Sequence, residues 1–116
     1  MKLGTWGEDT AAGYLTAHGY KIIERNFSCR IGEIDIIAED GDTIVFAEVK
    51  TRRSMRYGLP CESITDNKKR HILRTIKYYL MVRGIGDRDL RVDVVEILHK
   101  EGISYVRHIR NAIQGG

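Results

Sequence analysis

The chain has 116 residues, which is enough for one domain and too short for two. With 42% hydrophobic residues, 30% charged residues and a net charge of +3, its composition is globular and excludes wholesale disorder. Cys29 and Cys61 lack the spacing of a zinc site, and no apolar run approaches the roughly 18 residues that span a bilayer. We therefore expect a soluble cytoplasmic domain over residues 1–110, without a signal peptide or membrane contact, and a flexible tail over residues 111–116.

The first predicted element is a helix over residues 3–18, which Gly19 would stop. Thr5 at the N-cap and Glu8 three positions later have the spacing of a capping box. Glu8 therefore has two open roles, either as the partner of Thr5 in that cap or as a functional carboxylate. Residues 20–27 predict the first strand, and a turn follows it.

A β-hairpin is predicted next. Residues 33–38 and 43–49 are rich in Ile and Val, and Glu39 to Asp42 between them have hairpin-turn chemistry. A loop of two or four residues sets Ala38 opposite Thr43. Because opposed residues share a face and the side chains of a strand alternate, this pairing sorts the polar residues of the hairpin between its two faces.

One face of the hairpin collects Asp35, Glu48 and Lys50, with the two acids as diagonal neighbours. Like charges this close repel each other, and a divalent cation such as Mg²⁺ would stabilise them. Lys50 could then stabilise charge at a phosphate. The plainer alternative is an ion pair between Glu48 and Lys50 on a soluble edge. Glu33 has the same parity, and is either an outer ligand or a solvated charge.

A helix over residues 66–83 follows, with Thr65 as its N-cap and Gly84 as its stop. Its apolar residues recur at helical spacing and should pack on the sheet, and Lys68 falls on this inner line. Lys68 is therefore predicted to point toward a cleft beside the acidic face of the hairpin, whereas His71 is predicted to be a surface residue. The candidate nucleic-acid contacts are basic residues that flank the hairpin: Arg52, Arg53, Lys68, Lys69 and Arg70.

The last predicted elements are strands over residues 90–99 and 103–109. A strand, a helix and a further strand form the crossover that a parallel pair requires. The sequence therefore predicts an α/β fold with a mixed sheet of about five strands and a helix on each side.

Charge is distributed unevenly along the chain. Residues 31–49 contain six acidic residues and no Lys or Arg, whereas residues 50–77 contain nine Lys and Arg and two acidic residues, a local charge of +7. Carboxylates that hold a metal need such a flank, because it offsets their repulsion of a polyanion. A uniformly basic chain would indicate binding alone.

Three runs together resemble a known family: GEIDIIA at residues 32–38, FAEVKTR at 46–52 and YGLP at 57–60, followed by the basic helix. They are similar to the bacterial YraN-type family, which is related to the archaeal Holliday-junction resolvases of the PD-(D/E)xK superfamily. The resemblance implies a restriction-endonuclease-like fold and a nuclease that uses Mg²⁺ or Mn²⁺ to cut DNA, branched or structured DNA in particular. It also implies a homodimer.

The resemblance also assigns residues. It implies that Asp35 and Glu48 bind the metal together with the Val49 carbonyl and Glu8, and that Lys50 is the catalytic lysine. One departure from the pattern is Ile34, where the superfamily has proline. The alternative function is a non-catalytic nucleic-acid-binding module on the same fold. A structural protein with an ion-paired hairpin would leave the basic flank unexplained.

Overall fold

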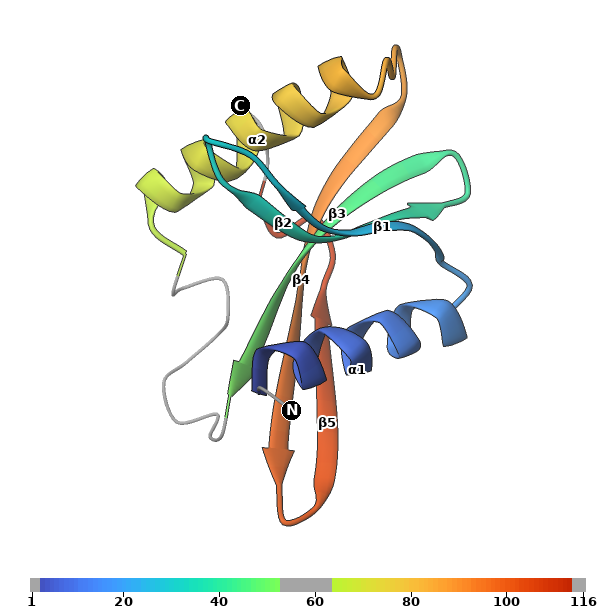
Figure 1. Cartoon of the computed structure of the whole chain (residues 1–116). Coiled ribbons are helices and arrows are strands. Elements are labelled where there is room, and N and C mark those ends of the chain that lie inside the picture. Colours follow the sequence, from blue (N-terminus) through green and yellow to red (C-terminus); the bar gives the residue numbers. More distant parts are fainter. Residues whose placement is uncertain (1–2, 53–63, 114–116) are drawn as a thin grey trace.

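The computed structural model describes residues 3–52 and 64–113, and their side chains from Thr5 onward. Within these residues, two helices and five strands follow one another: α1 (Leu3–Ala17), β1 (Lys21–Ser28), β2 (Glu33–Asp40), β3 (Thr43–Arg52), α2 (Asp66–Val82), β4 (Asp89–Lys100) and β5 (Ile103–Ile109). The strands form one sheet in the order β1-β2-β3-β4-β5. Only β3 and β4 are parallel, and α2 lies in the connection between them (Figure 1).

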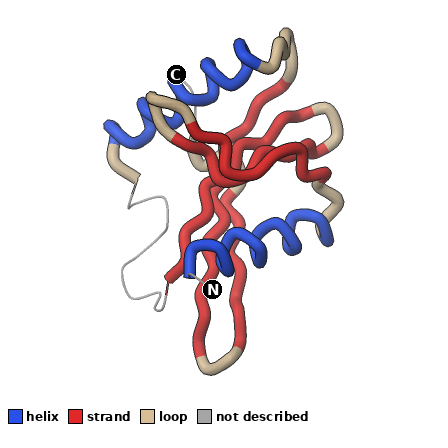
Figure 2. Tube along the Cα trace, viewed as in Figure 1, coloured by secondary structure: helices blue, strands red, loops and turns tan. Residues whose placement is uncertain are grey.

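The sheet lies between the two helices, which cover opposite faces (Figure 2). On the α2 side, Ile44 and Phe46 of β3 pack with Tyr79 of α2. On the α1 side, Val45 and Ala47 pack against helix residues that include Leu15. A central strand buried on both faces has to be apolar at consecutive positions, which explains the run IVFA at residues 44–47. The predicted α/β fold with a five-stranded mixed sheet is confirmed.

The hairpin forms as predicted, but its register differs by two residues. Asp40, not Ala38, lies opposite Thr43, so Gly41 and Asp42 make the turn. Gly41 has a φ of 60°, the positive value that a type II′ turn requires at its first central position. A shift of two preserves the alternation of faces. It also moves Asp35 from a position diagonal to Glu48 to one directly opposite.

The predicted N-cap at Thr5 is wrong, since α1 already includes Leu3. The capping box therefore does not account for Glu8. Thr5 has the local preference of an N-cap residue, but packing of the helix on the sheet extends α1 toward the N-terminus, beyond Thr5 to Leu3. At α2 the prediction is confirmed, because the Thr65 hydroxyl accepts a hydrogen bond from the Lys68 N–H (3.1 Å).

The end of the chain is bound to the sheet further than predicted. The Asn111 N–H donates to the Asp93 carboxylate (2.9 Å), the Ala112 N–H donates to the Val92 carbonyl (2.8 Å), and Ile113 is 3% exposed. The expectation of a flexible tail from residue 111 does not hold for these three residues. Buried backbone groups need partners, and β4 supplies them. Residues 114–116 lie outside the described part.

In the parts of the chain that the structure describes, neither helix is long and apolar enough to cross a membrane.

Candidate active site

Strands β2 and β3 part from each other at the candidate site. Their pairing runs from Asp40 opposite Thr43 to Ile36 opposite Ala47. Beyond that point β2 continues beside β1, and β3 continues beside β4 (Figure 1). In this gap the Val49 N–H donates to Oδ2 of Asp35 at 2.7 Å. The Asp35 carboxylate thus accepts the hydrogen bond that a backbone carbonyl of a neighbouring strand would otherwise accept. Because Ile36 lies opposite Ala47, the next residues, Asp35 and Glu48, also lie opposite each other.

The surroundings of Asp35 oppose its negative charge. Burial, followed by the nearby carboxylates of Glu48, Glu8 and Glu33, raises the pKa of Asp35 from 3.8 to about 6, and the hydrogen bond from Val49 offsets only part of this effect. A cation bound between the carboxylates would favour the charged form of Asp35 and lower its pKa again. The predicted proximity of Asp35 and Glu48 is therefore present, and its electrostatic cost is measurable.

Two lysines contact the same oxygen of Glu48. The Nζ atoms of Lys50 and Lys68 lie 3.7 and 3.4 Å from Oε1 of Glu48, whose side chain is 11% exposed. Lys50 comes from β3, and Lys68 comes from the first turn of α2. Lys68 points toward the acidic residues, as its position on the inner line of the helix indicates. The site thus combines two acids and two amino groups from three elements.

Glu8 approaches the site from α1. It is one of the carboxylates that raise the pKa of Asp35. With its amide oriented by the hydrogen bonds around it, Asn26 donates to both carboxylate oxygens of Glu8, at 3.0 and 2.8 Å. Asn26 has a φ of 56°, a left-handed conformation that asparagine tolerates better than most residues. The sequence analysis missed Asn26, although an asparagine inside a strand is itself a signal.

Gly7 brings α1 close to β3. A Cβ atom at this position would lie 1.9 Å from Oγ1 of Thr51, so any side chain here would force the Thr51 side chain or the helix itself to shift. The next residue along the helix is Glu8. This close approach, which the sequence analysis also missed, therefore sets how near the Glu8 carboxylate comes to Asp35.

The predicted nucleic-acid contacts are placed unequally. Arg52 forms an ion pair with Glu96, which is 1% exposed and also binds Arg107 of β5 at 2.7 Å. Glu96 of β4 thus links Arg52 of β3 to Arg107 of β5, and the carboxylate partner of Arg52 is already in place. Lys69 is half-buried and Arg70 is exposed on the first turns of α2. Arg53 and the YGLP run at residues 57–60 lie outside the described residues.

The donor set fits a magnesium or manganese ion with few protein ligands. No group of three or more His, Cys, Asp or Glu side chains in residues 3–52 and 64–113 is arranged to hold a metal. Magnesium is commonly held by one or two carboxylates, with waters and substrate oxygens completing its shell. Asp35 and Glu48 supply that number, and Val49 adjoins them through its N–H.

Comparison with known proteins identifies the family. The sequence model of the uncharacterised protein family UPF0102 matches residues 7–97. The chain belongs to the UPF0102 family. A UPF0102 protein of Clostridium acetobutylicum is 47% identical over 115 residues, which cover 97% of this chain and 94% of that protein. One of Caldicellulosiruptor saccharolyticus is 44% identical, with 96% of both chains covered. One of Geobacter sulfurreducens is 45% identical, with 97% and 88% covered.

The UPF0102 match includes every residue of the candidate site, from Glu8 on α1 to Lys68 on α2. It confirms the resemblance to the YraN-type family. The names of these relatives give the family and no activity.

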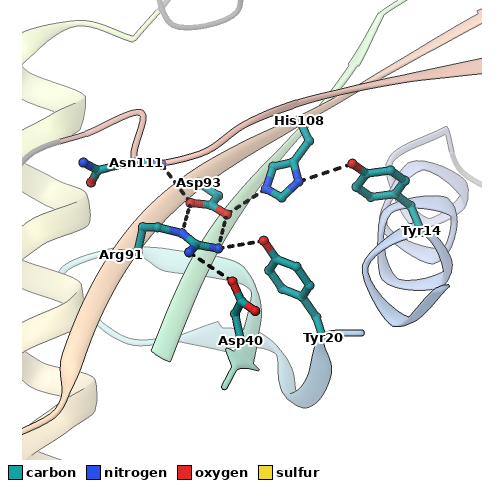
Figure 3. Close-up of polar contacts among 7 residues, drawn as sticks. All are labelled: Tyr14, Tyr20, Asp40, Arg91, Asp93, His108 and Asn111. Carbon is teal, nitrogen blue, oxygen red and sulfur yellow. Dashed lines mark hydrogen bonds and ion pairs between the residues drawn. The ribbon is translucent and has the colours of Figure 1, made fainter. Parts of the chain in front are cut away.

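This UPF0102 chain also has a second, buried polar cluster around Asp93, which is 0% exposed (Figure 3). His108, Arg91 and the Asn111 N–H donate to its carboxylate at 2.7–2.9 Å, and Arg91 also reaches Tyr20 at 2.7 Å. Burial alone would raise the pKa of Asp93, but these hydrogen bonds outweigh it and lower the pKa. The cluster is a satisfied network that ties β4 and β5 to the start of β1.

Proposed function

We propose that this protein is a metal-dependent nuclease that hydrolyses phosphodiester bonds of DNA, and of branched or structured DNA in particular. The observation that carries the proposal is the pair Asp35 and Glu48. The two carboxylates meet where β2 and β3 part, burial and repulsion raise the pKa of Asp35 to about 6, and two lysines lie beside Glu48. A cation bound between the two carboxylates would offset this repulsion and stabilise the pair.

In this proposal Asp35 and Glu48 would hold Mg²⁺ or Mn²⁺ together with the Val49 carbonyl, and Glu8 would lie beside them as a further carboxylate rather than as a third acidic ligand. When bound, the ion lowers the pKa of a coordinated water and offsets the charge of the scissile phosphate. Lys50 orients the attacking water and stabilises the developing charge. Asn26 keeps the Glu8 carboxylate directed at the site through its two hydrogen bonds.

In the proposal, the first turns of α2 bind the phosphate backbone of the DNA. Lys68, Lys69 and Arg70 lie there, and a helix N-terminus itself favours phosphate oxygens. Cleavage of two strands at one junction needs two sites related by symmetry, so a homodimer is part of the proposal.

The test combines metal binding with cleavage in one pair of variants. Mg²⁺ and Mn²⁺ are titrated by calorimetry into the wild type and into Asp35→Asn, and labelled four-way-junction DNA is then added. We expect the wild type to bind metal and cut the junction, and Asp35→Asn to lose about 100-fold or more of both, because one of its two carboxylate ligands is gone.

Asp42→Asn is the matched control, since Asp42 is an exposed acid in the turn of the same hairpin. It should bind metal and cut as the wild type does. Equal cleavage by Asp35→Asn and Asp42→Asn would contradict the proposal. The same chemical change would then have the same effect at the two positions, and Asp35 would have no special role in cleavage.

The second candidate is a nucleic-acid-binding module without catalysis. Its supporting observation is that Lys50 and Lys68 already pair with Glu48 without a metal. Junction binding by the wild type, with neither metal binding nor cleavage, would favour this candidate.

A further inference from the structure

A pocket of about 320 Å³ lies between the start of β2 and the inner side of α2. The sheet side contributes Ser28, Ile31 and Glu33, and the helix contributes Lys68, His71 and Ile72. Its volume is at the lower end of the ~300–1,000 Å³ of sites for small ligands, which suits a single compact group.

The shape of this pocket is fixed by a tight turn of the backbone. The Cys29 N–H donates to the Gly32 carbonyl at 2.9 Å, and Gly32 packs so closely on α2 that a Cβ atom would lie 2.9 Å from Oγ1 of Thr75. The Thr75 hydroxyl in turn donates to the His71 carbonyl at 2.7 Å. The wall between turn and helix is therefore formed before any ligand binds.

The pocket adjoins the candidate active site and shares a residue with it. Lys68 lines the pocket, and its Nζ lies 3.4 Å from Oε1 of Glu48. Glu33, on the opposite wall, is two residues from Asp35 on the same strand. A group in the pocket therefore sits next to the position of the scissile phosphate in the proposed nuclease.

The lining matches a nucleobase better than a phosphate or an aliphatic group. Ile31 and Ile72 offer apolar contact, and the His71 imidazole is a ring on which a base can stack. Glu33 is an acceptor and Lys68 a donor for the polar edge of a base. The Glu33 carboxylate disfavours a phosphate, and the charged walls disfavour an aliphatic chain.

We propose that this pocket binds one unpaired nucleobase of the nucleic-acid substrate, beside the phosphodiester that is cut. The inference rests on the proposed function and adds to it the class of substrate. A paired base would first have to leave its stack, whereas a base at a branch point, flap or bulge is already available. The pocket thus selects DNA with unpaired nucleotides over uninterrupted duplex.

The test compares two three-way junctions that differ only at the branch point, where one carries unpaired thymidines and the other carries abasic sites. Binding is measured by fluorescence anisotropy in EDTA with Asp35→Asn protein, so that neither metal nor cleavage contributes. We expect the junction with bases to bind about tenfold more tightly, since the stacking of one base on a side chain contributes an effect of this size.

Two variants in the same background locate the effect. His71→Ala removes the stacking ring, and Ser28→Trp fills the pocket; both positions are exposed, so folding is preserved. Each variant should bind the two junctions about equally, so that the tenfold preference for the junction with bases is lost. His18→Ala removes another exposed histidine, at the far end of α1, and should keep the preference.

The outcomes separate this inference from the proposed function. No binding to either junction would overturn the base pocket, and cleavage of the junction by the wild type in Mg²⁺ would then decide the proposed function by itself. Equal binding to the two junctions would overturn only the base pocket, and so would a preference that survives in His71→Ala and Ser28→Trp. A preference that only these two variants lose would support the pocket, whether or not the wild type cuts DNA.

Discussion

At the scale of single residues, Asp35 is held in a position that disfavours its charge. It is partly buried, it faces Glu48, and Glu8 and Glu33 add to the repulsion. Its one hydrogen bond from the described backbone, from the Val49 N–H, compensates only in part. Such a residue weakens the fold at neutral pH unless a cation is bound, and this makes its role testable without an activity assay.

The pH dependence of stability follows from the raised pKa of Asp35. Between pH 3.8 and about 6 the folded protein holds a proton at Asp35 that the unfolded chain has lost, so this group's contribution to stability falls as the pH rises through that window. In EDTA at pH 8, we expect Asp35→Asn to raise the free energy of unfolding by up to about 3 kcal/mol. Below pH 4 the difference should vanish.

Urea unfolding at both pH values measures this effect. Asp42→Asn, in the exposed turn, should change the free energy of unfolding little at either pH. If Asp35→Asn were less stable than the wild type by the same amount at pH 4 and pH 8, the charge of Asp35 would not be the cause.

At the scale of elements, the contact between α1 and β3 decides whether Glu8 belongs to the site. Gly7→Ala would set a Cβ atom 1.9 Å from Oγ1 of Thr51. We expect a loss of ~1–3 kcal/mol in the free energy of unfolding from this overpacking, although alanine favours a helix more than glycine does. Cleavage should fall as well, because α1 carries Glu8 away from Asp35.

Two comparisons identify the cause of this effect. Gly13→Ala, on the same helix with no atom within 4 Å of the added Cβ, should raise stability by up to ~1 kcal/mol. Adding Thr51→Ala to Gly7→Ala removes the nearest clash and should restore part of the loss. A Gly7→Ala protein as stable as Gly13→Ala would show that α1 does not need this close approach.

At the scale of the whole molecule, the Asp93 cluster joins elements that lie far apart along the chain (Figure 3). Asp93→Asn would leave Arg91 and His108 without their buried carboxylate, and we expect a loss of ~3–5 kcal/mol in urea unfolding at pH 7. Asp9→Asn breaks only an exposed pair with Arg25 and should cost under ~1 kcal/mol. Equal losses would mean that the cluster adds nothing to the fold.

The elements and the faces of the hairpin could be predicted from the sequence, because both depend on periods of two and 3.6 residues that neighbouring residues set. The α2 helix with its Thr65 cap and the strand over residues 103–109 follow directly from such local patterns. The alternation of side chains along the strands likewise placed Ile37, Ile44 and Phe46 on one face, the face that packs under α2.

Other features were decided only by tertiary structure. The start of α1 at Leu3, before the expected cap at Thr5, depends on packing against the sheet. The contacts of Asn26 with Glu8 and of Gly7 with Thr51 join residues from separate elements, and no local period encodes them. The sequence by itself therefore determined which side chains share a face, whereas the distances between elements arose only when the two helices packed on the sheet, because steric contact acts between residues far apart in the chain.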